Sequence, residues 1–259
     1  MILKDIINIL EKKFPTKNAE NWDNVGLMIG DRRKEIKKIQ ISLDCTIVAI
    51  DKAIENGVDL ILTHHPIIFK GIKKINSDDV LGRKIIKLIQ NDIAVYSMHT
   101  NLDATKFGLN DLVAEKLGAE SFKIIEKIET DIESGIGREF RLKKEVTLKD
   151  YIVFIKEEFN ISNLRVISEN IDKPIKKIAV VNGSGMSYWR DAKKLKADLF
   201  ITGDVSYHDA LDAKESGLSV IDMGHFESEI CFSKIILEEL KDLQIETEIF
   251  NDGPIIENY

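Results

Sequence analysis

The chain has 259 residues, enough for one large domain or two of ordinary size, so a substantial hydrophobic core is expected. Hydrophobic residues make up 44% and charged residues 31%, a balance typical of a globular α/β protein and too polar for a membrane protein. The formal net charge of -7 argues against a protein built mainly to coat nucleic acid.

The sequence predicts a cytoplasmic location. Its apolar runs are shorter than the roughly 18 residues of a spanning helix. The stretch from Met1 to Phe14 has the pattern of an amphipathic helix rather than of a signal sequence. The two cysteines, Cys45 and Cys231, have no partner at ligand spacing, which excludes a structural cysteine-type zinc site and fits a reducing compartment.

The first half of the chain alternates strand and helix patterns. β-branched residues mark the strands, and Gly or Asn stands at the helix ends. This alternation predicts parallel strands joined by right-handed crossovers. The predicted elements are a strand at 36–43, a helix at 46–56, a strand at 58–63, a helix at 80–90 and a strand at 93–98.

The second half repeats this order. Its predicted elements are a strand at 175–181, a helix at 188–196, a strand at 198–202, a helix at 209–215, a strand at 218–223 and a helix to Leu240. Ile36 to Ile39 and Asp59 to Leu62 recur in similar form 139 residues later, and His99 and Asp103 recur 126 residues later as His225 and Glu229. We interpret this as a duplicated α/β unit, with chance convergence as the alternative.

Residues 122–171 do not follow the alternating strand and helix pattern of the two halves. GIGREFRL predicts a strand entered through a glycine turn, Thr147 opens a predicted helix, and NLRVIS predicts another strand. We assign this stretch to the second domain as an antiparallel addition. The predicted domains are therefore residues 1–125 and 126–259, and the last helix and strand could pack back on the first domain.

All five histidines follow predicted strands, where an open parallel sheet forms its functional crevice. They are His64 and His65, which end the second strand, His99 after the third, and His208 and His225 in the second half. In an extended chain successive side chains point to opposite sides, so His64 and His65 are expected to address two neighbouring ions rather than one. The alternative is one hydrogen-bonded ring and one exposed ring.

Two carboxylates strengthen the metal interpretation. Asp103 lies four residues after His99, and Glu229 lies four residues after His225. Imidazole and carboxylate ligands without a thiol suit divalent Zn, Mn, Fe, Co or Ni, and a carboxylate can bridge two cations. Three to four of the histidines with these two acids match the ligand count of a two-ion site.

Three other places in the chain have weaker signals. The turn from Gly183 to Gly185 is interpreted as a tight turn, with a phosphate site as the alternative. Trp22 is expected to pack in the interior, whereas the neighbouring Asp23 and Asn24 could line a site. Cys45 is interpreted as a small buried thiol.

Seven stretches resemble successive motifs of the Nif-three-like family, whose members are often labelled GTP cyclohydrolase I type 2 homologues. They are NWDNVGLMIG, LTHHPIIFKGIKKI, YSMHTNLDATKFGLNDLVAEKLG, GIGR, NGSG, ITGDVSYHDALDA and IDMGHFESE. The resemblance implies two similar α/β domains related by a pseudo-two-fold, with mixed, mainly parallel sheets and a dinuclear metal centre in the cleft between them. It also implies a toroidal homohexamer, built as a trimer of dimers. The inserted domain of longer members is absent here.

The same resemblance assigns site residues. The family's metal ligands fall on His64, His65, Asp103, His225 and Glu229, with Asp103 as the bridge. His99 and His208 fall on neighbouring motif positions and are the candidates for catalytic proton transfer. The implied cofactor is two divalent metal ions per subunit.

The expected function is metal-dependent hydrolysis of a small, nucleotide-like substrate, as in a cyclohydrolase. The alternative is a non-catalytic, metal-binding hexameric scaffold or a regulatory protein. Nucleic-acid binding is the least favoured function, and no membrane partner is expected.

Overall fold

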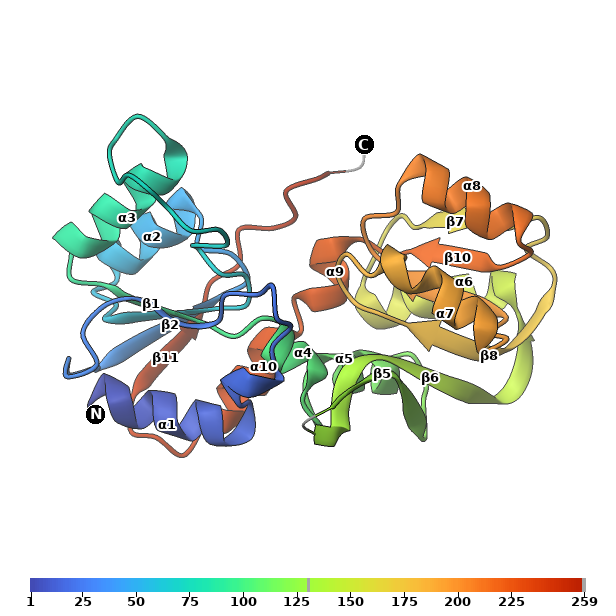
Figure 1. Cartoon of the computed structure of the whole chain (residues 1–259), viewed down its shortest axis with the longest axis horizontal. Coiled ribbons are helices and arrows are strands. Elements are labelled where there is room, and N and C mark those ends of the chain that lie inside the picture. Colours follow the sequence, from blue (N-terminus) through green and yellow to red (C-terminus); the bar gives the residue numbers. More distant parts are fainter. Residues whose placement is uncertain (130, 258–259) are drawn as a thin grey trace. The chain divides into compact units, whose positions relative to one another are not determined.

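A computed structural model describes residues 1–129 and 131–257. The protein is a mixed α/β structure with two sheets, and it divides into two compact units (Figure 1). Of the described residues, the first unit contains Met1–Thr105 and Phe232–Gly253, and the second contains those within Lys106–Cys231 and residues 254–257. The first unit ends before residue 125 because α5 (Leu109–Lys116) packs on a strand of the second sheet.

The first sheet has the strand order β1-β4-β3-β2-β11. Its strands are β1 (Gly26–Ile29), β2 (Lys38–Ser42), β3 (Leu60–Thr63), β4 (Ala94–Ser97) and β11 (Glu246–Ile249). β2, β3 and β4 are parallel, as the alternating pattern predicts, whereas β1 pairs antiparallel with β4. β11 joins the other edge parallel to β2.

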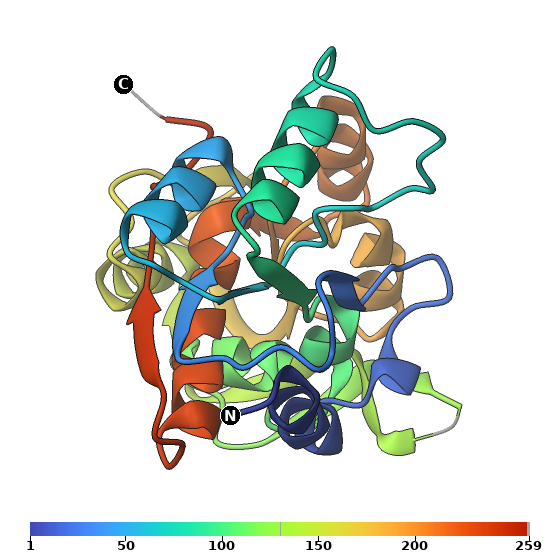
Figure 2. The same ribbon diagram turned by 90° about the vertical axis from the view of Figure 1, so that its left-hand side faces the viewer.

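Helices cover both faces of this sheet (Figures 1 and 2). α2 (Ile47–Glu55) and α3 (Val80–Gln90) cover one face, and their Ile50 and Leu88 pack into one buried cluster with Ile61 of β3. The opposite face is covered by α1 (Leu3–Lys13) and α10 (Phe232–Leu240). Each such aliphatic side chain contributes about 1.5–3 kcal/mol to stability when folding buries it away from water.

Within the described part of the chain, every helix falls short of the length and hydropathy of a membrane span.

Short helices complete this unit between the longer elements. They are the 3-10 helix η1 (Thr16–Asn18) and α4 (Thr100–Ala104). Side chains fix the start of both long crossover helices: Thr46 Oγ1 accepts from the N–H of Ala49 at 3.0 Å, and Asp79 Oδ1 accepts from the N–H of Gly82 at 2.7 Å.

The second sheet has the strand order β5-β6-β8-β9-β10-β7. Its strands are β5 (Phe122–Ile128), β6 (Asp131–Thr147), β7 (Arg165–Ile167), β8 (Pro174–Val180), β9 (Leu199–Thr202) and β10 (Ser219–Asp222). β8, β9 and β10 are parallel. β5, β6 and β7 pair antiparallel, which confirms the antiparallel addition predicted for residues 122–171.

The helices of the second unit connect and cover these strands. Besides α5 they are α6 (Leu148–Phe159), the 3-10 helix η2 (Met186–Tyr188), α7 (Trp189–Lys194), α8 (Tyr207–Glu215) and α9 (His225–Glu229). Thr147 caps the start of α6, as predicted: its Oγ1 accepts from the N–H of Asp150. α5 and α6 pack against β6, and α8 packs against β10.

The repeated sequence carries repeated hydrogen bonds. The carboxylate of Asp59 accepts from two consecutive backbone N–H groups at the start of β2, and the carboxylate of Asp198 does the same at β8. The donors are Lys37 at 2.7 Å and Lys38 at 3.0 Å in the first unit, and Lys176 at 2.9 Å and Lys177 at 2.7 Å in the second. The segments that recur in the sequence 139 residues apart therefore also share a local hydrogen-bonding pattern.

The predicted helix from β10 to Leu240 is divided in two. α9 ends at Glu229 and α10 begins at Phe232. The chain leaves the second unit and enters the first between Cys231 and Phe232, so a continuous helix would have to belong to both.

Arg138 of β6 is a fully buried cation. Its Nε donates to Asp111 Oδ1 at 2.5 Å, and its Nη1 donates to the carbonyls of Gly135 and Gly137 at 2.7 and 2.9 Å. Removing the guanidinium would leave the buried Asp111 carboxylate without its cation.

We therefore expect Arg138→Met to lower the free energy of unfolding by about 3–5 kcal/mol. Urea denaturation followed by circular dichroism measures this loss. Arg141→Met in the same strand replaces an exposed arginine and should change the value by no more than about 0.5 kcal/mol. Equal effects of the two variants would contradict the role assigned to the buried ion pair.

Candidate metal centre

Three histidines of the first unit converge at the carboxyl ends of two adjacent parallel strands. His64 and His65 follow β3, and His99 follows β4, where Thr63 is in register with Ser97. The three rings offer nitrogen atoms that all lie within 4.8 Å of one another. The ring centroids are 5.1 to 5.6 Å apart. We call these three residues the histidine cluster.

The expectation that His64 and His65 point to opposite sides is wrong. β3 ends at Thr63, and the chain bends at residues 64 and 65. The two-residue alternation of an extended strand therefore does not apply to them. Both rings instead face His99, with His64 buried and His65 partly exposed.

Oxygen atoms hold Nδ1 of every ring in the histidine cluster. Nδ1 of His64 lies 2.8 Å from the carbonyl of Met98, that of His65 lies 2.8 Å from Asp44 Oδ1, and that of His99 lies 2.9 Å from Asp23 Oδ1. A carbonyl or carboxylate oxygen can only accept, so Nδ1 carries the hydrogen and donates it. A neutral ring then carries its lone pair on Nε2, the arrangement found in metal-ligating histidines.

Asp103 adds a carboxylate to the cluster. It lies on α4 and is buried, with 7% of its surface exposed. Its Oδ1 is 3.7 Å from Nε2 of His64, which is longer than a hydrogen bond. Two acceptor atoms at this separation can each lie about 2.0–2.2 Å from one cation between them, so the donor set fits a divalent metal.

Asp23 is the residue that orients His99. Burial acts to raise the pKa of this carboxyl, but hydrogen bonds from His99 and Thr100 lower the pKa further, so the net result lies below the usual value. Thr100 donates both its N–H, at 3.1 Å, and its hydroxyl, at 2.5 Å. Asp23 therefore stays ionised at neutral pH and stabilises a positive charge on His99.

The second unit has its own imidazole and carboxylate. His225 begins α9, and its Nε2 lies 3.0 Å from Oε2 of Glu229, one turn later. Nδ1 of His225 lies 2.6 Å from Asp204 Oδ2, so it too donates to an oxygen. With the hydrogen on Nδ1, Nε2 and the Glu229 oxygen are both acceptors. A proton or a cation between them is needed for this close approach to be favourable.

Gly183 provides the room for Glu229. Its φ is +59°, and a Cβ at this position would collide with the Glu229 carboxylate and lie 3.5 Å from Nε2 of His225. The N–H of Gly183 donates to Ser228 Oγ at 2.9 Å, and that of Gly185 donates to Thr202 Oγ1 at 3.0 Å. These donors are used within the unit, which supports the tight turn rather than the phosphate site.

The remaining candidates belong neither to the histidine cluster nor to the pair formed by His225 and Glu229. His208 is exposed on the first turn of α8, against the ring of Tyr207. Burial raises the pKa of the Cys45 thiol to about 12, so it stays protonated at neutral pH, as expected for a small buried thiol. Trp22 was expected in the interior, but 59% of its surface is exposed.

Two oxygen acceptors escaped the sequence analysis. They are Asp44, which lies just after β2, and Asp204, which lies in the motif that contains His208. Asp204 lies 139 residues after His65, so the repeat contained the signal. In the first unit this position is a histidine, and in the second it is the carboxylate that holds one.

The fold and its residues define a two-unit mixed α/β protein with imidazole and carboxylate groups after its parallel strands. The model of the DUF34/NIF3 (NGG1p interacting factor 3) family matches residues 1–252, and the chain belongs to this family. A Clostridium perfringens protein named GTP cyclohydrolase 1 type 2 homolog is 52% identical over 229 residues, which cover 88% of this chain and 87% of that protein.

Two further comparisons cover nearly the whole chain. A Clostridium acetobutylicum protein, also named GTP cyclohydrolase 1 type 2 homolog, is 44% identical over 99% of this chain and 97% of its own. A crystal structure of a Staphylococcus aureus protein matches with a TM-score of 0.90 at 30% identity, over 100% of this chain and 99% of that one. The family resemblance of the seven motifs is thereby confirmed.

The lowered pKa of Asp23 predicts a pH-dependent contribution to stability. Its contribution is fully present above the unfolded pKa, near 3.8, and is lost as the pH falls through the lower folded value. In chelator-treated protein, Asp23→Asn should reduce the free energy of unfolding at pH 7 by about 1–3 kcal/mol, and this difference should shrink below pH 3.8. Urea titrations of both proteins across this range measure it. Asp78→Asn, an exposed control, should show no such trend, and a difference for Asp23→Asn that is constant with pH would exclude the explanation.

Proposed function

We propose that this protein is a metal-dependent hydrolase that holds two divalent cations and acts on a nucleotide-like substrate. The observation that supports this most is the convergence of three imidazoles with Nδ1 held by oxygen, beside the buried carboxylate of Asp103. In this proposal the carboxylate of Asp103 would contribute to holding both cations, because a carboxylate can bridge two ions. The proposed ligands are His64, His65 and Asp103 of the first unit with His225 and Glu229 of the second.

The names of the relatives support the substrate class. Both clostridial proteins are named as homologues of a GTP cyclohydrolase, an enzyme whose substrate is a purine nucleotide. Two divalent cations, when bound, supply a water of lowered pKa and polarise the electrophile.

The chain's own contribution to proton transfer is assigned to His99. Its Nδ1–H is held by the ionised Asp23, so Nε2 can take up a proton and the resulting imidazolium is stabilised by the carboxylate. This is the role of an oriented general base that later returns the proton as an acid. His208 is the second candidate, and its exposed position on α8 makes it a suitable control.

Metal stoichiometry tests the ligand assignment. After loading with Zn, Mn or Fe and removal of excess ion, we expect elemental analysis to find two ions per chain. His65→Ala and Asp103→Ala should each lose metal because a ligand atom is missing, with unchanged far-ultraviolet circular dichroism. His208→Ala should retain both ions. Only trace metal in the loaded wild type would rule the assignment out.

Turnover tests the proposed activity. A screen of metal-loaded protein against nucleotides and phosphoesters should find hydrolysis that Asp103→Ala and chelation abolish. His99→Ala should retain metal but lower kcat by about 10²–10⁴-fold, because the oriented base is lost. A folded, inactive apoprotein would support catalysis, whereas metal removal that unfolds the protein, with no turnover in the loaded form, would support the scaffold alternative.

A further inference from the structure

Two large aromatic side chains lie exposed beside the histidine cluster. Trp22 is 59% exposed and Phe69 is 46% exposed. Their ring centroids are 5.7 Å apart, and the ring of His99 lies 6.0 Å from Trp22 and 6.5 Å from Phe69. An exposed aromatic pair in contact with a candidate site marks a ligand surface more often than a lone exposed residue does. We call Trp22 and Phe69 the aromatic platform.

The backbone on either side of the platform is held in place. Asp23, next to Trp22, has a buried carboxylate with three hydrogen bonds from His99 and Thr100. The side chain of Asn24 donates to the carbonyl of Ile68, next to Phe69, at 2.5 Å. The two loops are thereby joined at the platform. Because both loops are held by hydrogen bonds, the two exposed rings keep their positions before a ligand binds. Such preorganisation lowers the entropy cost of binding.

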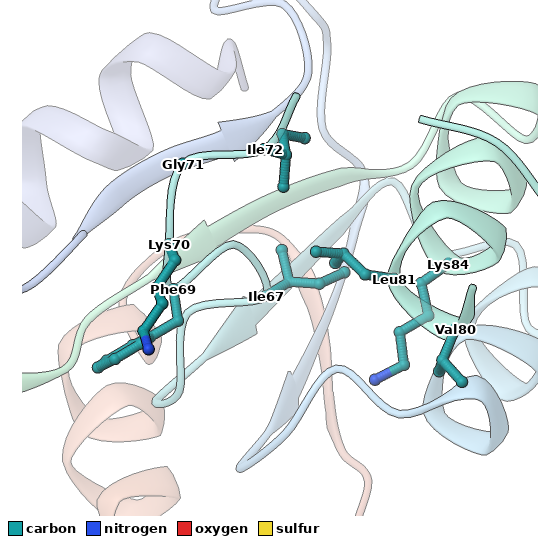
Figure 3. A pocket seen from close by; sticks show the side chains of 8 residues that line it. All are labelled: Ile67, Phe69, Lys70, Gly71, Ile72, Val80, Leu81 and Lys84. Carbon is teal, nitrogen blue, oxygen red and sulfur yellow. The ribbon is translucent and has the colours of Figure 1, made fainter. Parts of the chain in front are cut away.

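Phe69 also lines a cavity of about 480 Å³ between its loop and α3. The other apolar lining residues are Ile67, Ile72, Val80 and Leu81. Figure 3 shows Phe69 and Lys70 on one side of this cavity, Lys84 with Val80 and Leu81 on the other, and Ile67 between them. Among the residues that the structure describes, this lining contains two cationic side chains and no carboxylate.

The charges of this cavity indicate the chemistry of its ligand. Among residues 1–129 and 131–257, neither Lys70 nor Lys84 forms an ion pair or a side-chain hydrogen bond with a carboxylate. The two ammonium groups would repel a cation, and a wholly apolar ligand would form no ion pair with either of them. A ligand with an anionic group on an apolar or aromatic body can pair with the lysines and also pack against the apolar side chains.

The loop that carries Phe69 is closely packed on α3. A Cβ at Gly82 would collide with the carbonyl oxygen of Asn76, so only glycine permits this approach. The N–H of Gly82 donates to Asp79, which begins the helix. The contacts of Gly82 with Asn76 and Asp79 thus fix the position of the loop against α3 within the first unit.

We propose that a planar heteroaromatic ring of the substrate stacks on Trp22 beside His99, with Phe69, whose ring is tilted by 52° to that of Trp22, against its edge, and that Lys70 and Lys84 bind the anionic group of the same molecule. The proposal rests on the proposed hydrolase for its reaction, because it places the ring next to the groups that would act on it. Ring binding itself needs only the first unit's side chains. A purine nucleoside monophosphate has both features.

Fluorescence and calorimetry test the platform. The chain has two tryptophans, and Trp189 is buried, so Trp189→Phe leaves Trp22 as the only indole emitter. In this background guanosine 5′-monophosphate should quench Trp22 saturably, whereas ribose 5-phosphate, which lacks the ring, should not. Calorimetry should show that Trp22→Ala weakens binding by about 5- to 150-fold and that Trp22→Phe restores most of it.

The lysines are tested with the same probes. Lys84→Gln should weaken binding of guanosine 5′-monophosphate but not of guanosine, because only the former has the anionic group. Lys73→Gln, an exposed lysine of the same loop outside the cavity lining, should weaken neither. Equal losses for both probes would overturn the anion assignment.

The outcomes separate this inference from the proposed function. Binding that persists in Asp103→Ala, and is still lost in Trp22→Ala, supports the platform even if no turnover is found. Wild-type affinity in Trp22→Ala overturns the platform even if the protein hydrolyses nucleotides. Absence of nucleotide binding to the wild type, or equal binding of ribose 5-phosphate, also overturns it.

Discussion

The hydrogen bond from histidine Nδ1 to an oxygen acceptor orients four rings, those of His64, His65, His99 and His225. An imidazole can rotate and exchange tautomers, so a ring without such a partner does not present one defined nitrogen. Here three acceptors are carboxylates and one is a backbone carbonyl. Each fixes the hydrogen on Nδ1 and thereby directs the lone pair of the neutral ring through Nε2. The chemistry of the site follows from this constraint.

The sheets supply these acceptors at low conformational cost. His64 and its acceptor Met98 follow adjacent parallel strands, so the ring of His64 lies beside the backbone carbonyl that it contacts. His65 and Asp44 likewise follow the adjacent strands β3 and β2. Asp23 lies in the loop between η1 and β1, and its bonds to Thr100 hold that loop to the start of α4. Rigid strand ends thus position the donors before any ligand binds.

Much of the fold was predictable because it is encoded locally. β-branched runs separated by capped helices predicted the parallel strands, and the texture of residues 122–171 predicted antiparallel ones. The break between α9 and α10 was not predictable, because it arises from the passage of the chain between two units rather than from a local signal. The unit boundary at Thr105 likewise depends on the packing of α5 against β6.

The site was predictable in its residue types but not in its geometry. Strand periodicity suggested opposed rings for His64 and His65, but both residues lie beyond the end of β3 at Thr63, where the alternation no longer holds. The exposure of Trp22 is a tertiary property that no local pattern reports. The acceptor of His65 lies 21 residues away and that of His99 lies 76 residues away, so these pairs are visible only once the chain is folded.

Crystals of zinc-loaded protein, measured at the zinc absorption edge, test the orientation of the rings most directly. The account predicts anomalous density about 2.0–2.1 Å from Nε2 of His64 and His65, with both Nδ1 hydrogen bonds to Met98 and Asp44 retained. Zinc coordinated through Nδ1, or no anomalous density beside these two residues in fully loaded crystals, would contradict it.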